Sequence, residues 1–230
     1  MPIFLLNKEI IFPPVHLATR EGILAAGGDL SPERLLLAYQ SGIFPWYSPD
    51  EPILWWSPDP RFLVFPDKIH MNKRTLRYLK NHSFKITFDY AFESVIENCS
   101  LSRKKSSGTW ITEEMKEAYL KLHLLGLAHS VEVWKEGNLI GGLYGVSIGK
   151  CFFGESMFHI EPNGSKIAFF TLVLKLKELG FLFIDSQVHT QHIENWGGET
   201  ICRKEYLKIL KNGISFDSIQ GKWCDKKEFQ

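Results

Sequence analysis

Proline is distributed very unevenly along this chain, and it restricts the backbone more than any other residue. Ten of the eleven prolines lie at or before Pro66, and only Pro162 lies beyond it. Because proline fixes φ and removes a hydrogen-bond donor, regular elements are interrupted wherever prolines cluster. We therefore predict a small Pro- and Trp-rich N-terminal domain over residues 1–61, followed by a more regular domain over residues 62–230.

The composition is that of a globular protein. A chain of 230 residues with 44% hydrophobic and 23% charged side chains can bury a core unaided, and it is neither a disordered segment nor a coiled-coil rod. The four cysteines show no spacing typical of zinc or a disulfide framework, so we expect no metal and a reducing, cytoplasmic location. The longest apolar run, 167–174, is far shorter than the ~20 residues of a membrane-spanning helix. We expect no membrane partner.

The charges are nearly balanced, but they are not evenly placed. The net charge is +1 overall, −3 over residues 1–61 and +4 over residues 62–230. Six Lys or Arg side chains and one Asp lie within residues 66–85, and a second basic run covers residues 103–105. Local basic patches on a neutral chain suit a partner that is touched at one place, such as a nucleic-acid backbone. A solvated helical face explains the same pattern.

Three segments have the apolar spacing and end signals of helices. Ser31 followed by proline begins the first, which ends near Gly42. Thr112 begins the second, with acids in its first turn and its end at residue 126. The third begins after Asn163 and ends near residue 180.

The strands are predicted from alternation and turns. Residues 129–160 read as three antiparallel strands with turns at 136–138 and 149–150, and residues 181–188 read as a buried strand. The stretch 42–62 is too rich in proline for a regular element. The order of helix, strand meander, helix and strand predicts an α+β fold of acyltransferase type.

Two kinds of residue stand out as candidates for function. Trp46, Trp55 and Trp56 lie on the proline-stiffened stretch, where they can serve either as stacking platforms or as core between domains. Glu155 and Asp185 are acids inside apolar strands, and a buried carboxylate must be paired, hydrogen-bonded or protonated. Strict alternation places Glu155 on one face with Phe153 and Met157, and Asp185 on one face with Gln187.

The order of several sequence blocks resembles one family. These blocks are GDLSPERLL with YQSGIFPW, WWSPDPR, GTWIT, CFFGESMF, NGSKIAFFTLV and IDSQVHTQHIENWGGETICRKEYL. Together they resemble the leucyl/phenylalanyl-tRNA–protein transferases over about residues 27–207. The resemblance implies a small N-terminal domain joined to a GNAT-like acyltransferase domain with a mixed, mostly antiparallel sheet.

The resemblance also implies a reaction. Members of the family transfer Leu, Phe or, less readily, Met from an aminoacyl-tRNA to the N-terminal Arg or Lys of a protein, which marks that protein for N-end-rule degradation. No cofactor is implied. The expected partners are aminoacyl-tRNA and proteins with N-terminal Arg or Lys, and we expect a monomer.

Individual positions follow from the matching motifs. The residues implied to bind the aminoacyl-tRNA 3′ end are Trp46 and Trp110 near the terminal adenosine, and Phe152, Met157, Ile184, Leu143, Phe169 and Leu172 around the aminoacyl side chain. An apolar pocket discriminates weakly among similar apolar groups, so a broad donor range follows. The pair Phe169-Phe170 and the His- and Trp-rich loop after Gln187 depart from the usual pattern, which leaves the donor preference open.

Asp185 and Gln187 match the reactive pair of the family. An α-amino group has a pKa of ~7.7–8.0, so part of it is neutral at cellular pH and catalysis can rest on orientation and on help with one proton. We expect Asp185 to hold Gln187, whose amide oxygen positions the amine; direct base action by Asp185 remains an alternative. Glu155 is expected to accept the cationic side chain of the acceptor's first residue.

The candidates for contacts with tRNA phosphates are Lys73, Arg74, Arg77, Lys80, Arg103 and Lys104. Two other functions fit parts of the sequence. An acetyl-CoA-dependent N-acetyltransferase shares the architecture, but NGSKIAFF lacks its glycine-rich pyrophosphate turn. A non-catalytic RNA-binding module explains the basic segment and the tryptophans, but it leaves Asp185, Gln187 and Glu155 without a role.

Overall fold

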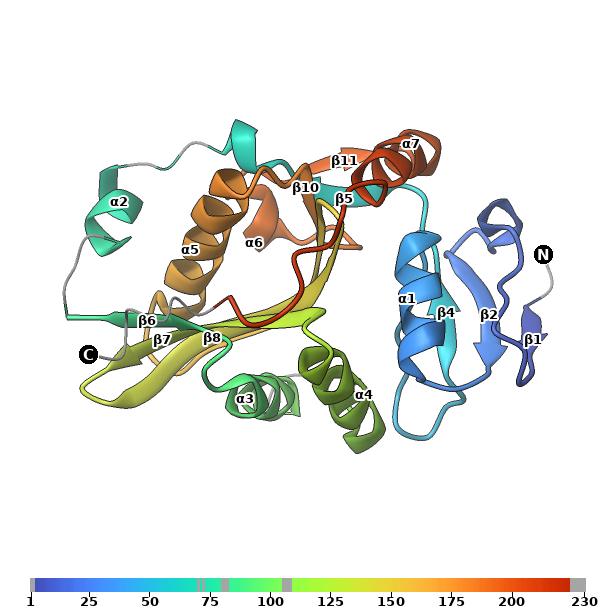
Figure 1. Ribbon diagram of the computed structural model, residues 1–230, viewed down its shortest axis with the longest axis horizontal. Coiled ribbons are helices and arrows are strands. Elements are labelled where there is room, and N and C mark those ends of the chain that lie inside the picture. Colours follow the sequence, from blue (N-terminus) through green and yellow to red (C-terminus); the bar gives the residue numbers. More distant parts are fainter. Residues whose placement is uncertain (1–2, 70, 72, 80–82, 105–108, 224–230) are drawn as a thin grey trace.

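The computed structural model describes residues 3–69, 71, 73–79, 83–104 and 109–223; within it, the side chains of Arg74 and Lys104 are not described. The described chain forms two β-sheets with helices on both faces of the larger one (Figure 1). Among the described residues, no helix is both long enough and apolar enough to cross a membrane.

The smaller sheet is built by the first 56 residues. Its strands are β1 (Phe4–Leu6), β2 (Ile23–Gly27), β3 (Phe44–Pro45) and β4 (Leu54–Trp56). Their order is β1-β2-β4-β3, with β1 parallel to β2 and the other pairs antiparallel. One helix, α1 (Pro32–Gln40), lies between this sheet and the rest of the molecule (Figure 1). As predicted, Ser31 caps it: its Oγ accepts a hydrogen bond from the Arg34 amide at 3.4 Å.

The proline-rich stretch 42–62 is more regular than predicted. It contains β3 and β4 and leads into β5 (Arg61–Val64), the first strand of the larger sheet. The expectation that no regular element forms here is therefore wrong. The prolines fall between the strands or in the edge strand β3, where a missing donor breaks no ladder hydrogen bond.

The larger sheet has seven strands in the order β11-β5-β10-β9-β8-β7-β6. Its further strands are β6 (Lys85–Phe88), β7 (Ala128–Lys135), β8 (Asn138–Ile148), β9 (Cys151–His159), β10 (Phe183–Asp185) and β11 (Glu199–Ile201). Only β9 and β10 pair in parallel; the other neighbours are antiparallel. The predicted α+β fold with a mixed, mostly antiparallel sheet is confirmed, as are the three strands within 129–160.

Helices cover both faces of this sheet. The helices α3 (Phe92–Lys104) and α4 (Glu113–Leu124) lie on one face, and α5 (Gly164–Glu178) lies on the other with α2 (Lys73–Leu79) and α6 (Gln191–Glu194) beside it (Figure 1). The last helix, α7 (Arg203–Gly213), lies near β5 and β11. Thr112 caps α4 as predicted, since its Oγ1 accepts the Met115 amide at 3.2 Å. The short turns η1 (Val15–Leu17) and η2 (Pro66–Lys68) complete the order.

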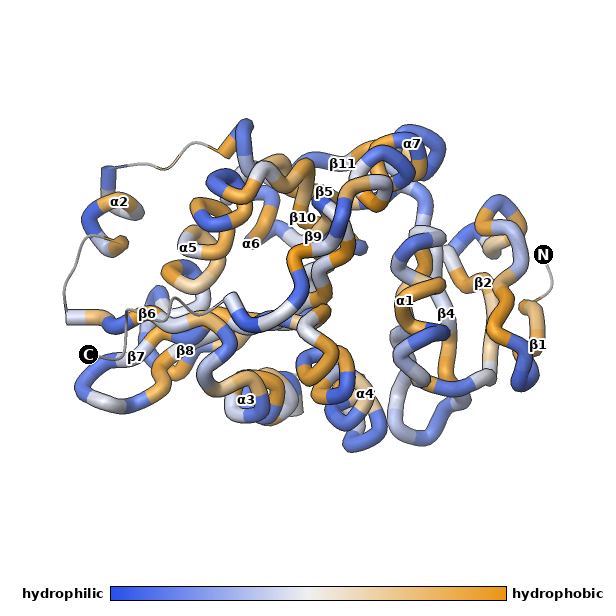
Figure 2. The backbone as a smooth tube through the Cα atoms, viewed as in Figure 1, coloured by the Kyte–Doolittle hydropathy of each residue, from blue (hydrophilic) through white to orange (hydrophobic). Residues whose placement is uncertain are grey.

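Apolar side chains form two clusters, and Figure 2 shows the apolar stretches of the strands and helices that supply them. One cluster runs from the smaller sheet, with Leu24 and Trp55, to the larger sheet, with Phe153 and Phe183. The other lies between α5 and the larger sheet. The first cluster packs the two sheets against each other, whereas every buried residue of the second lies beyond residue 61, so the larger sheet also has a core of its own.

Candidate functional site

A cavity of about 220 Å³ opens between the loop after α1 and the larger sheet. Ten of the eleven residues predicted for the aminoacyl-tRNA 3′ end, the acceptor's first residue and catalysis line it: Trp46, Trp110, Leu143, Phe152, Glu155, Met157, Phe169, Leu172, Ile184 and Gln187. The other lining residues are Phe44, Pro45, Arg103, Tyr144, Gly154, Ser156, Ser186, Val188, Thr190 and Ile193. Residues spread over more than 140 positions of sequence therefore meet at one place.

The walls of the cavity differ in character. One part is apolar, because Phe152, Leu172 and Ile184 belong to the buried cluster under α5. At the opening, Trp46 is 41% exposed and its ring centroid lies 5.4 Å from that of Trp56. Trp55 is fully buried, so of the two expectations for the tryptophans, Trp55 fits core and Trp46 fits an accessible platform.

Glu155 lies where β9 has one residue more than β8. Tyr144 pairs with Ser156 and Gly145 pairs with Gly154, so Glu155 is the extra residue of a bulge. The bulge shifts the alternation: Phe153 packs into the first apolar cluster and Met157 against the second. The prediction that Phe153 and Met157 share a face is therefore wrong.

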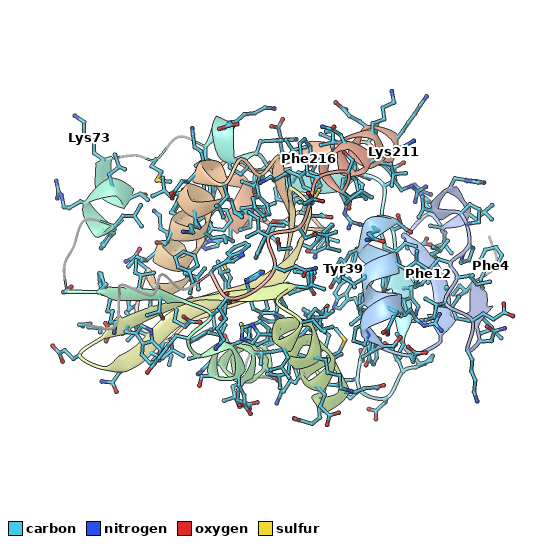
Figure 3. The ribbon with its side chains drawn as sticks, in the orientation of Figure 1. Phe4, Phe12, Tyr39, Lys73, Lys211 and Phe216 are labelled. Carbon is cyan, nitrogen blue, oxygen red and sulfur yellow. The ribbon has the colours of Figure 1, made fainter. Side chains whose placement is uncertain are left out.

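Two tyrosines hold the Glu155 carboxyl group. Tyr39 donates to Oε1 and Tyr119 donates to Oε2, both at 2.8 Å. Figure 3 labels Tyr39 on the side of α1 that faces the larger sheet. Burial, together with the charge of Glu155, raises the pKa of both tyrosines, so both remain donors.

The pKa of Glu155 is raised to about 7, chiefly because burial disfavours the charged form. The number of hydrogen atoms available for hydrogen bonds around Glu155 also favours a raised pKa. The two tyrosine hydroxyls also lie 2.5 Å from each other. Three short oxygen–oxygen contacts therefore need a hydrogen: Tyr39 to Tyr119, Tyr39 to Glu155 and Tyr119 to Glu155. The two tyrosine hydroxyls supply two hydrogens, and a protonated Glu155 supplies the third. The carboxyl group can therefore change protonation state near neutral pH.

Gln187 occupies the cavity wall beside Glu155. Its side-chain nitrogen donates to Glu155 Oε1 at 3.2 Å, so the amide oxygen is the end left to accept a hydrogen bond. Its backbone is left-handed, with φ of 57°. The strand β10 ends at Asp185, whereas the prediction had it continue to residue 188. In a continued strand, the side chain of Gln187 would lie on the same face as that of Asp185, away from the cavity. The left-handed turn at Gln187 brings its side chain to the cavity instead.

Asp185 does not line the cavity, and its side chain is fully buried. Arg61 binds both carboxylate oxygens, with Nε 2.9 Å from Oδ1 and Nη2 2.8 Å from Oδ2. Tyr206 donates to Oδ2 at 2.7 Å, and the Gln187 backbone amide donates to Oδ1 at 2.9 Å. Each oxygen thus accepts at least two hydrogen bonds. Neither oxygen has a free lone pair with which Asp185 could accept a proton from a substrate in the cavity.

Of the three basic candidates whose side chains are described, Arg103 lines the cavity. Its Nε donates to Ser156 Oγ at 3.0 Å, and its guanidinium carbon lies 5.7 Å from the Trp110 ring centroid. Lys73 and Arg77 are exposed on α2, and Figure 3 shows Lys73 at the surface. The side chains of Arg74 and Lys104, and Lys80 as a whole, lie outside the described residues.

Sequence reasoning missed four polar side chains that support this site: Tyr39, Tyr119, Arg61 and Tyr206. Helical periodicity treats Tyr39 and Tyr119 only as members of apolar helix faces. A buried tyrosine hydroxyl normally has a partner, which was the available signal. Arg61 lies in the block WWSPDPR that carried the resemblance, but nothing in the spacing indicated its partner 124 positions later.

Comparison with known proteins decides the family. Residues 28–59 match the model of the leucyl/phenylalanyl-tRNA protein transferase N-terminal domain, and residues 63–211 match that of leucyl/phenylalanyl-tRNA protein transferase. The chain belongs to the leucyl/phenylalanyl-tRNA–protein transferase family. A member from Syntrophus aciditrophicus is 52% identical over 99% of this chain and 96% of its own. One from Myxococcus xanthus is 49% identical over 98% of this chain and 97% of its own.

Solved structures outside the leucyl/phenylalanyl-tRNA–protein transferases are more distant. A GCN5-related N-acetyltransferase-like protein from Streptococcus suis is 13% identical, with a TM-score of 0.37 over 70% of this chain and 59% of that one. The L-PGS of Bacillus licheniformis is also 13% identical, with a TM-score of 0.40 over 74% of this chain and 57% of that one. At these scores the likeness carries no conclusion about ligand or activity.

In the part of the chain that the structure describes, no group of three or more His, Cys, Asp or Glu side chains could hold a metal ion. The polar groups that reach the cavity are a carboxyl group, an amide, hydroxyls and one guanidinium. Such a set can orient an amine and an ester by hydrogen bonding.

Proposed function

We propose that the cavity binds the aminoacyl end of leucyl-, phenylalanyl- or methionyl-tRNA, and that the protein transfers this amino acid to the N-terminal Arg or Lys of an acceptor protein. Such a transfer marks the acceptor for degradation through its new N-terminal residue. The observation that carries the proposal is that ten separately predicted residues of this family line one cavity. The alternatives, an N-acetyltransferase and a non-catalytic RNA-binding module, are not favoured by the comparisons.

The apolar wall is the proposed slot for the donor side chain. Phe152, Met157, Phe169, Leu172 and Ile184 offer contacts without charge, so they favour Leu, Phe and Met over polar side chains. One methylene changes the binding free energy by only ~1–3 kcal/mol in such a slot, which explains a range of donors. Met157 can adapt to donors of different shape because its side chain is unbranched and flexible.

The opening of the cavity is the proposed seat of the terminal adenosine. Trp46 and Trp110 provide aromatic faces, and stacking contributes ~1–3 kcal/mol per base with little dependence on the base. Arg103 is fixed beside Trp110 by Ser156. We assign it to the phosphate nearest the terminal nucleoside, and Lys73, Arg74, Arg77, Lys80 and Lys104 to phosphates further along the acceptor stem.

The proposed reaction is aminolysis of an ester. The acceptor α-amino nitrogen attacks the ester carbonyl carbon, the bond from that carbon to the ribose oxygen breaks, and one amine proton passes to this oxygen, which leaves as the ribose hydroxyl. Gln187 positions the amine through its amide oxygen. The amide nitrogen is bound to Glu155, so the oxygen is the end of the amide that is left for the substrate. Asp185 acts on Gln187 rather than on the amine, because its oxygens are occupied and lie outside the cavity.

Glu155 is the proposed partner of the acceptor's first side chain. Its Oε1 accepts from Tyr39 and Gln187, whereas its Oε2 accepts from Tyr119 alone. A carboxylate offers about four acceptor positions, so Oε2 retains one for a guanidinium or ammonium group. This role requires an ionised Glu155, which a nearby cation itself favours.

The test is transfer of labelled Phe or Leu from charged tRNA to three peptides that differ only in a first residue of Arg, Lys or Ala. We expect transfer to the first two only. Transfer of acetyl from labelled acetyl-CoA to the same peptides, with none from tRNA, would overturn the proposal. Asp185→Ala should bind aminoacyl-tRNA and fail to transfer; if the wild type binds tRNA without transferring, the RNA-binding module is correct.

We further propose that the parts 1–61 and 62–230 act as two domains of a monomer in the cytoplasm, where charged tRNA is available. Size-exclusion chromatography with light scattering checks the monomer. Immunoblotting of cell fractions checks the compartment.

A further inference from the structure

Arg61 is a buried cation whose every side-chain nitrogen has a partner. The residue is 1% exposed and lies at the start of β5. Nε and Nη2 bind the two oxygens of Asp185, and Nη1 donates to the Gly42 carbonyl at 3.3 Å. Burial has the largest single effect and lowers the pKa of Arg61, but the charges of Asp185, Tyr206 and Glu155 and the hydrogen bonds to Asp185 together outweigh it and raise the pKa, so the guanidinium stays charged.

The plane of this guanidinium is fixed by one ring from the smaller sheet and one from α7. Its carbon lies 4.8 Å from the Phe44 ring centroid and 4.7 Å from that of Tyr206. A planar guanidinium that contacts rings and binds a carboxylate through two nitrogens has little freedom to rotate. Asp185 is therefore held in one orientation.

That orientation bears directly on Gln187. Asp185 Oδ1 accepts the Gln187 backbone amide at 2.9 Å, two residues along the chain. Gln187 is left-handed with φ of 57°, a region that residues with a Cβ rarely occupy. A conformation of this kind persists only where the surroundings fix it, and it is found frequently at functional sites. The contact with Asp185 holds the Gln187 amide in this conformation, and the Phe62 amide donates to the Gln187 carbonyl at 3.3 Å.

We propose that Arg61 is a positioning residue for peptide-bond formation: through Asp185 it holds Gln187 in the left-handed conformation that brings its side-chain amide to the cavity. This inference rests on the proposed function. Arg61 touches neither donor nor acceptor, because it does not line the cavity. Its charge alone is insufficient, since the orientation depends on its two-point contact with Asp185.

The variant that tests this is Arg61→Lys, which keeps the charge and loses the planar two-point contact. We expect the single-turnover transfer rate, at saturating donor and acceptor, to fall about 100-fold, as for a misplaced catalytic group. Arg34→Lys is the matched control. Arg34 is equally buried and binds the carbonyls of Asn7 and Glu9, away from the cavity. It should keep the rate within about twofold, and equal rates for the two variants would overturn the inference.

A second comparison separates positioning from general loss of structure. In a Gln187→Ala background, Arg61→Lys should cause no further decrease in rate, because its route of action is gone. If Arg61→Lys lowers the rate in the Gln187→Ala background as much as it does in the wild type, the inference is overturned. The backbone amide resonance of Gln187 in ¹H–¹⁵N NMR spectra should move in Arg61→Lys and stay in place in Arg34→Lys.

Failure of the proposed function has a different signature. If wild-type protein transfers nothing, the proposed function is wrong, and the NMR comparison still decides whether Arg61 holds Gln187. If Arg61→Lys does not fold, Tyr206→Phe replaces it. That variant removes one hydrogen bond to Asp185 and keeps the ring beside Arg61, so the rate should fall about two- to tenfold. An unchanged rate would overturn the inference.

Discussion

Replacing Glu155 by glutamine should stabilise the protein at alkaline pH and impair its activity. The fold raises the pKa of this carboxyl group from 4.5 to about 7. Between those two values the folded protein holds a proton that the unfolded chain has released. Each rise of one pH unit therefore removes up to ~1.4 kcal/mol from the free energy of unfolding, until Glu155 is ionised in both states. Glutamine has the same shape and does not titrate.

The size of the effect follows from that difference in pKa. The full interval corresponds to roughly 3 kcal/mol, and solvent at the cavity wall reduces it to about 2–3 kcal/mol. The excess in free energy of unfolding of Glu155→Gln over the wild type should therefore grow by about 2–3 kcal/mol between pH 5 and pH 8. Transfer to Arg- and Lys-initiated peptides should decrease, because the variant cannot carry the negative charge proposed to bind the acceptor.

The measurement is urea denaturation of both proteins from pH 5 to pH 8, followed by circular dichroism. Only the difference between the two proteins is used, so groups that titrate equally in both cancel. Glu117→Gln, on the exposed face of α4, is the control for the substitution itself. A difference that is constant over this range, or one that shrinks as pH rises, would refute the reasoning. Full activity of Glu155→Gln would refute the acceptor role.

Three further outcomes are expected. Trp46→Ala should weaken binding of aminoacyl-tRNA by ~1–3 kcal/mol in a filter-binding assay, with most of the affinity kept in Trp46→Phe; equal affinity for all three proteins would argue against stacking. Replacing Lys73 and Arg77 by Ala should reduce the slope of log affinity against log salt by about one per residue, and an unchanged slope would remove α2 from the tRNA surface. Leu172→Trp should lower kcat/KM for phenylalanyl-tRNA about tenfold more than for leucyl-tRNA, and equal decreases would place the donor side chain elsewhere.

Much of the fold could be predicted because its signals are local. Ser31 and Thr112 cap their helices through side-chain contacts three residues away, and a sequence shows such contacts directly. The strands within 129–160 follow from alternation and from two turns. The residues of the apolar slot were named by resemblance to a family, and the structure then placed them around one cavity.

The errors at the site have a common physical origin, which is backbone irregularity. Alternation assigns side chains to faces only while the strand is regular. The bulge at Glu155 and the left-handed Gln187 both interrupt it. The supporting contacts were hidden for another reason: Arg61 and Asp185 are 124 positions apart, and Tyr39 and Glu155 are 116 apart. No spacing rule reaches across such distances.

The hydrogen bond from Tyr39 to Glu155 makes the site depend on residues from both the N-terminal part of the chain and the larger sheet. Phe44, Pro45 and Trp46, in the segment after α1, furnish one side of the cavity, and residues beyond position 100 furnish the rest. A gene that lost its first quarter would keep Glu155, Asp185 and Gln187 but forfeit a tyrosine and a tryptophan that flank them. Chimeras made between relatives should therefore work only when both partners of such a bond are exchanged together.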